Sequence, residues 1–107
     1  MRGWILPFAF LLGCAGSAAD HERLGDTAYA PGEYANALEE YRAASRGGKD
    51  ARVLAKLGAV ALKLGEFREA AEAYTNLAGA DRTRTTEAAR GLELVARGAD
   101  RAGSGAA

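Results

Sequence analysis

The chain contains few of the residues on which most protein chemistry depends. It has one cysteine, one histidine and two prolines among its 107 residues, and aromatic residues make up only 7% of it. A single cysteine cannot form an intrachain disulfide, and one histidine with one cysteine cannot supply the several ligands of a structural zinc site. The composition therefore excludes a disulfide-stapled fold, and we expect neither a metal site nor a cofactor.

A surplus of charge of one sign is also lacking, because 14 Lys and Arg residues balance 14 Asp and Glu residues. A protein that binds nucleic acid without sequence preference needs excess cations to neutralise phosphates, so we expect no nucleic-acid partner. Alanine, in contrast, is abundant, with 26 residues. Because alanine is the best helix former and buries little area per residue, the composition predicts slender, closely packed helices in one domain.

The first residues have the pattern of a secretory signal. Arg2 precedes an uninterrupted apolar run over residues 4–12, and small residues follow over residues 13–19. A cationic start, a short apolar run and a small-residue exit are typical of a signal peptide. The run is too short for a membrane-spanning helix, which needs roughly 20 residues.

The single cysteine stands where this apolar run ends. The segment Leu11-Leu12-Gly13-Cys14 resembles the lipobox of bacterial lipoproteins. The resemblance implies that residues 1–13 are removed as a signal peptide, that Cys14 carries an acyl chain such as palmitate, and that residues 14–18 form a short linker. The chain would then be lipid-anchored to a membrane of the bacterial envelope and face the periplasm. The alternative is cleavage further on, near residues 17–19, which would leave a secreted or periplasmic protein without an anchor.

The rest of the chain repeats with a period of 33 residues. Two series of glycines mark the period: Gly25, Gly58 and Gly91, and Gly32, Gly65 and Gly98. Around them the first two units share Leu-Gly-x-x-Ala, then Gly-Glu-aromatic, then Ala-x-x-x-Tyr. This pattern resembles the tetratricopeptide repeat (TPR), a helix–turn–helix unit of about 34 residues. Two units match over about residues 18–82. A third begins near residue 88, and the motif is no longer recognisable after residue 98.

Apolar residues at helical spacing indicate the same helices independently of the motif. The expected helices cover residues 19–30, 33–46, 50–64, 67–80 and 85–98. We therefore expect an all-α fold, in which antiparallel helix–turn–helix repeats stack as a short α-solenoid of about two and a half units. The repeat domain would cover residues 19–98, and residues 99–107 would form a flexible C-terminal tail.

The glycines of the period have two expected roles. Gly25 and Gly58 fall inside helices, where glycine costs about 1 kcal/mol relative to alanine. Close approach of Tyr41 and Tyr74 across the missing side chains would offset that cost. Glycines 32 and 65 follow the first helix of each pair, where glycine readily adopts the left-handed conformation that ends a helix.

The TPR resemblance implies a concave groove lined by the first helix of each unit. Carried over by position, the candidate peptide-binding residues are Asp26, Tyr29, Arg52, Ala55, Ala59, Leu62, Lys63, Leu92 and Val95. Arg52 and Lys63 lie 11 residues apart, roughly 16 Å along a helix axis. They could contact an acidic or carboxylate-ended peptide, and the alternative is that both are ordinary solvated charges.

No set of residues has a pattern typical of catalysis. His21 has no second ligand or nucleophile near it in sequence, and Glu39 and Glu40 are neighbours that point about 100° apart on a helix. We therefore expect a non-catalytic adaptor or scaffold that binds a protein partner in a cell-envelope assembly. The alternative is a structural subunit that self-associates through the incomplete third repeat and has no peptide ligand.

Overall fold

The computed structural model describes residues 16–106 of the chain, with side chains to residue 103. Within these residues there are helices but no strands. The elements are α2 (Ala18–Tyr29), α3 (Tyr34–Ser45), α4 (Ala51–Lys63), α5 (Phe67–Ala80), the 3-10 turn η2 (Arg82–Arg84) and α6 (Thr85–Ala106). The all-α expectation is confirmed, and the first four expected helices agree with the structure to within one residue at each end. The expected signal peptide and Cys14 lie outside the described residues.

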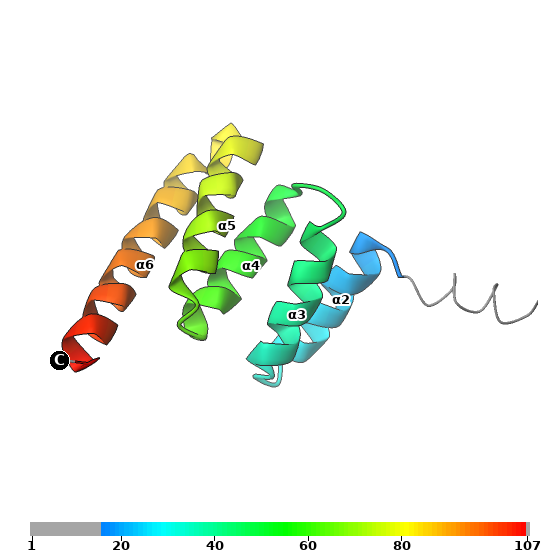
Figure 1. The fold of residues 1–107 in the computed structure, drawn as a ribbon. Helices are drawn as coiled ribbons and strands as arrows, with labels where there is room; N and C mark the ends of the chain where they lie inside the picture. Colours follow the sequence, from blue (N-terminus) through cyan, green and yellow to red (C-terminus); the bar gives the residue numbers. More distant parts are fainter. Residues whose placement is uncertain (1–15, 107) are drawn as a thin grey trace, which may run out of the picture.

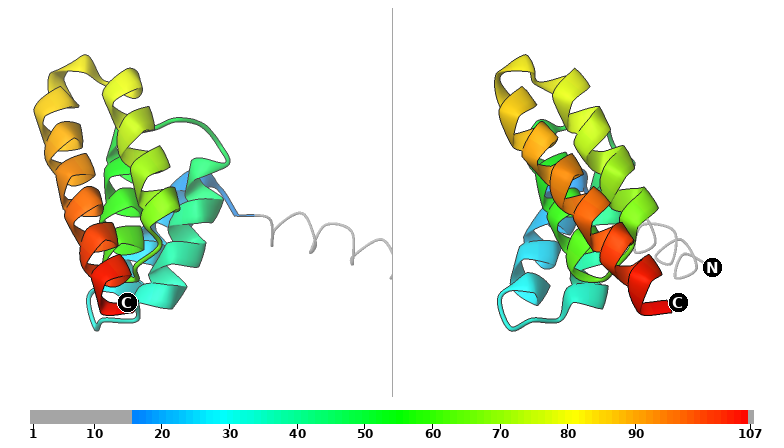
Figure 2. Two further views of the ribbon diagram at one scale, coloured as in Figure 1. Left: turned by 60° about the vertical axis from the view of Figure 1, so that its left-hand side comes forward. Right: turned by 90° about the vertical axis from the view of Figure 1, so that its left-hand side faces the viewer.

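Consecutive helices run antiparallel and lie side by side along the molecule (Figure 1). Helices α2 and α3 form one hairpin, and α4 and α5 form a second that packs beside the first. Helix α6 lies along α5 and also touches α4, as the turned views show (Figure 2). Helix α4 therefore lies in the interior of the stack, and it has the longest series of buried apolar positions.

The turns within the two hairpins have the same geometry. Gly32 has φ +89° and Gly65 has φ +76°, the left-handed conformation expected of them. In the first turn the amide of Glu33 donates to the carbonyl of Ala28 at 2.9 Å, and in the second the amide of Glu66 donates to Ala61 at 2.8 Å. This bonding pattern satisfies carbonyls that a helix end would otherwise leave unpaired. The two hairpins are thus closed identically, 33 residues apart.

The core is built on tyrosine rings that lie against glycine backbone. A Cβ placed on Gly25 would come within 2.5 Å of the Tyr41 ring, and one on Gly58 would come within 2.9 Å of the Tyr74 ring. The expected close approach is therefore confirmed in both hairpins. A Cβ on Gly91 of α6 would also come within 2.5 Å of Tyr74. The ring of Tyr74 consequently lies between two glycines, and it joins α4, α5 and α6.

Helix α6 differs from the expectation at its C-terminal end. The sequence predicted that it ends at residue 98 and that a tail follows, but the helix continues to Ala106. The third glycine of the turn series does not behave like the other two, since Gly98 keeps a negative φ. A Cβ on Gly98 would come within 2.7 Å of the Phe67 ring. Gly98 is therefore a packing glycine inside a helix, and the alanines beyond it favour continued helix.

We expect Gly91→Ala to destabilise the protein by about 1–3 kcal/mol, because the added methyl group overpacks a ring that Gly58 confines on its other side. The matched control is Gly79→Ala on α5, where a Cβ would meet nothing within 4 Å. That change should raise the free energy of unfolding by up to about 1 kcal/mol, the helix propensity of alanine over glycine. Urea unfolding measures both, and equal effects of the two substitutions would contradict the role of Gly91.

Candidate functional site

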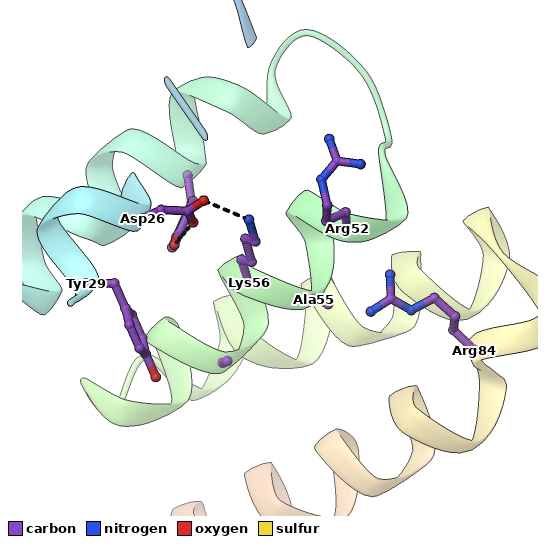
Figure 3. A pocket seen from close by; sticks show the side chains of 8 residues that line it. Asp26, Tyr29, Arg52, Ala55, Lys56 and Arg84 are labelled. Atoms are coloured by element: carbon purple, nitrogen blue, oxygen red, sulfur yellow. Dashed lines mark hydrogen bonds and ion pairs between the residues drawn. The ribbon is translucent and has the colours of Figure 1, made fainter. Parts of the chain in front are cut away.

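A hollow of about 350 Å³ opens between α2, α3, α4 and the 3-10 turn η2. Its lining residues are Asp26, Tyr29, Tyr41, Arg52, Ala55, Lys56, Ala59 and Arg84. Tyr29 lies toward one end of the hollow and Arg84 toward the other, with Ala55 between them (Figure 3). The lining residues therefore come from three helices and the turn η2, which only the packing of the helices brings together.

The hollow exists because its floor has small side chains. Ala55 and Ala59 lie one turn apart on the same face of α4, and both are partly exposed. Beside this floor the Tyr29 ring is held edge-on to the Tyr34 ring, with 5.2 Å between centroids and an interplanar angle of 62°. The site thus combines an apolar floor with a positioned aromatic ring, which is a favourable composition for contact with another protein.

A network of ion pairs connects the first hairpin to α4 along one wall of the hollow. Arg52 donates to both carboxylate oxygens of Glu22, at 2.7 and 2.9 Å, and Lys56 Nζ donates to Glu22 Oε2 at 2.7 Å. Lys56 also contacts Asp26 Oδ2 at 3.0 Å, and Asp26 Oδ1 accepts from the Tyr41 hydroxyl at 2.6 Å. The network therefore joins α2, α3 and α4, which are all the elements of the first hairpin and the first helix of the second.

Glu22 is the centre of this network, and only 8% of its surface is exposed. The hydrogen bonds from Arg52 and then from Lys56 lower its pKa from 4.5 to about 2. Burial raises the pKa of Tyr41, and its hydrogen bond to Asp26 raises it further. Both groups therefore keep one protonation state across the neutral range, with Glu22 ionised and Tyr41 neutral.

Five of the nine candidate groove residues line this hollow: Asp26, Tyr29, Arg52, Ala55 and Ala59. The other candidates lie elsewhere. Leu62 and Lys63 border a separate hollow beside Phe67 and the C-terminal half of α6. Lys63 Nζ lies 5.2 Å from the centroid of the Tyr34 ring, and Arg52 is engaged by Glu22. These two cations therefore do not form an open pair facing one hollow.

The groove prediction is wrong for Val95, which is only 7% exposed and belongs to the core. Leu92 is partly buried and packs against that core. The candidates on α6 were chosen on the assumption that α6 has the same rotation about its helix axis as α4. Because Gly91 lies against Tyr74, α6 instead turns the face with Ala88 and Val95 inward.

Three residues of the hollow were not among the candidates. Lys56 follows Arg52 by four residues, so helical spacing could have placed it on the same stripe. Arg84 belongs to the 3-10 turn η2, which no sequence pattern indicated. Tyr41 was expected to pack across a helix glycine, and only the structure shows that its hydroxyl also reaches Asp26.

The described residues hold no group of three His, Cys, Asp or Glu side chains that could bind a metal ion. His21 Nδ1 lies 2.8 Å from Glu40 Oε1, which makes it part of an ion-pair or hydrogen-bond contact between α2 and α3. None of the described helices is long and apolar enough to cross a membrane. Comparison with models of known families and with curated proteins finds no match to this chain.

We expect Glu22→Gln to lower the free energy of unfolding at pH 7 by about 1–3 kcal/mol, since it removes a charge to which two cations are bonded. The pKa of Glu22 is lowered on folding, so its contribution is present above pH 4.5 and is lost as the pH falls toward 2. Wild-type stability should therefore decline more steeply than that of the variant across this window.

The matched control is Glu39→Gln, because Glu39 forms an exposed ion pair with Arg42 within one helix. Urea unfolding at several pH values measures both variants. If Glu39→Gln flattens the pH dependence as much as Glu22→Gln does, the special contribution of Glu22 is disproved.

Proposed function

We propose that the hairpins α2–α3 and α4–α5 are units of the TPR type, stacked as a short α-solenoid. Support comes from contacts that recur at the same spacing as the sequence motif. Tyr41 on Gly25 recurs as Tyr74 on Gly58, and the closed turn at Gly32 recurs at Gly65. On this proposal α6 is the first helix of a third unit, rotated so that it caps the stack.

We propose further that the chain is a non-catalytic adaptor and that its hollow holds an extended segment of a protein partner. The observation that carries this proposal is the hollow itself, with its alanine floor on α4 between Tyr29 and Arg84. The charged groups around it are already bonded within the chain, Arg52 to Glu22 and Arg84 to Glu87. Such side chains orient and select a ligand by charge, whereas the floor and the aromatic ring supply the apolar contact.

A lipid anchor at Cys14 would place this adaptor at a membrane of the bacterial envelope. Helix α2 begins at Ala18, so only three residues lie between it and Cys14. The four Cα–Cα steps from Cys14 to Ala18 span at most about 14 Å. The anchored domain would therefore be held against the membrane, in a position to scaffold an envelope assembly. If the anchor is absent, the same domain would act as a secreted or periplasmic protein.

Mass spectrometry of the mature N-terminus tests the anchor. We expect the chain to begin at Cys14 and to carry acyl chains, and we expect Cys14→Ser to shift the protein from the membrane to the soluble fraction. The physical reason is that each buried methylene contributes roughly 0.8 kcal/mol to membrane attachment. A free thiol at Cys14, or a mature terminus beyond it, would rule out the lipoprotein proposal.

Site-specific photo-crosslinking tests the groove. A photoreactive phenylalanine analogue at Ala59, on the floor of the hollow, should yield a discrete adduct with one protein in bacterial cells. The matched control is the same substitution at Ala35, an exposed alanine of α3 outside the hollow. We expect the adduct from position 59 alone, and Tyr29→Ala should reduce it. No adduct from position 59, or the same adducts from both positions, would contradict a peptide-binding groove.

A further inference from the structure

The two junctions of the stack are held by different interactions. Four ion pairs join the first hairpin, α2–α3, to the second, α4–α5. Three of them belong to the network around Glu22. In the fourth, the guanidinium of Arg42 on α3 donates to both carboxylate oxygens of Glu69 on α5, at 2.7 and 2.6 Å. Within the described side chains, no ion pair joins α4 or α5 to α6.

The junction with α6 has a ring on glycine backbone instead, because the Tyr74 ring lies on Gly91 as well as on Gly58. The first junction lacks the equivalent contact. The three atoms nearest to a Cβ on Gly58 all belong to Tyr74, and none belongs to Tyr41 of the first hairpin. A ring confined between two backbones cannot shift without collision. Arginine and lysine, in contrast, have flexible stems that keep their bonds while two helices move by a small distance.

The connections at the two junctions differ in the same sense. Residues 46–50, between α3 and α4, are all exposed and include the adjacent Gly47 and Gly48. Figure 1 shows them as an open loop. The connection from α5 to α6 is the turn η2, in which the Asp81 carboxylate accepts from the amide and the hydroxyl of Thr83, at 2.9 and 2.6 Å. Because glycine has the widest choice of backbone conformations, the first connection is the more suitable hinge.

The hollow on α4 lies across the first junction. Asp26 and Tyr29 line it from α2, whereas Ala55 and Ala59 of the floor belong to α4, and Arg84 belongs to η2 (Figure 3). A rotation of the first hairpin would therefore change the width of the hollow between Tyr29 and its floor. Buried residues of both hairpins belong to one core cluster, which limits the movement to rocking without separation.

We propose that the first hairpin is a hinged wall of the groove, which rocks about residues 46–50 while α4, α5 and α6 move as one body. Outward rocking widens the hollow so that a partner segment can enter. The ion pairs then draw the wall back, and Tyr29 closes on the segment. This consequence for binding rests on the proposed peptide-binding function, whereas the hinge itself does not, so the two can be tested separately.

Distances between pairs of spin labels test the hinge in the detergent-extracted full chain, without any partner. The labels are attached through a ketone-bearing unnatural residue, so that Cys14 is left unchanged. One pair, at Ala35 and Thr75, spans the first junction, and the control pair, at Thr75 and Ala96, spans the second; all three positions are exposed on helices. Pulsed electron resonance should give a broader distance distribution for the first pair. Equally narrow distributions for the two pairs would overturn the hinge.

Removal of single charges tests whether ion pairs hold the wall. Glu69→Gln breaks the contact between α3 and α5, and it should lengthen the mean 35–75 distance by about 1–2 Å, the scale of helix shifts at packed interfaces. Lys56→Met weakens the contact between α2 and α4 and should broaden the same distribution, while Arg52 still holds Glu22.

The 75–96 distribution should stay unchanged in both variants. The matched control is Glu93→Gln, which removes an exposed ion pair within α6 and should alter neither distribution. Variants that leave the 35–75 distribution as it is, or that broaden both distributions alike, would refute an ionic hinge. A missing photo-crosslink at Ala59 would count against the peptide-binding groove alone, since these distances are measured without a partner.

Discussion

The structure depends on tyrosine rings that pack directly on glycine backbone. Tyr41 lies on Gly25, and Tyr74 lies between Gly58 and Gly91, where any side chain would collide with the ring. Glycine inside a helix is unfavourable, and here the close approach of two helices offsets that cost. Because Tyr74 contacts glycines on both sides, it sets the distance between α5 and its two neighbours. A chain with small, alanine-rich helices can form a dense core only where such contacts keep the helices close.

A second constraint is ionic, and it orients the first hairpin against α4. Glu22 is nearly buried between Arg52 and Lys56, and Asp26 extends the network to the Tyr41 hydroxyl. Removing one member of such a network leaves a desolvated charge without its partner. The resulting loss of stability is larger than the net stabilisation that the ion pair itself provides. The same residues form one wall of the hollow on α4. Structural and candidate functional roles therefore coincide in this wall, and substitutions there affect both.

The two faces of α6 have different surroundings among the described residues. Its inner face, with Gly91 and Val95, packs onto α5 and closes the core. Its outer face carries Leu94 between charges of both signs and remains exposed.

Local sequence determined most of the secondary structure, because helix periodicity, left-handed glycines and the Tyr–Gly register depend on neighbouring residues or on a fixed period. The resemblance to a known repeat, rather than the local sequence, suggested that Asp26, Tyr29 and the alanines of α4 share one surface. Only the tertiary structure decided the rotation of α6, which buries Val95, and the continuation of this helix beyond Gly98. The reason is that a glycine permits either a turn or a close contact, and the ring it meets selects between them. Arg84 likewise joins the hollow only because the packing of α6 brings η2 beside α4.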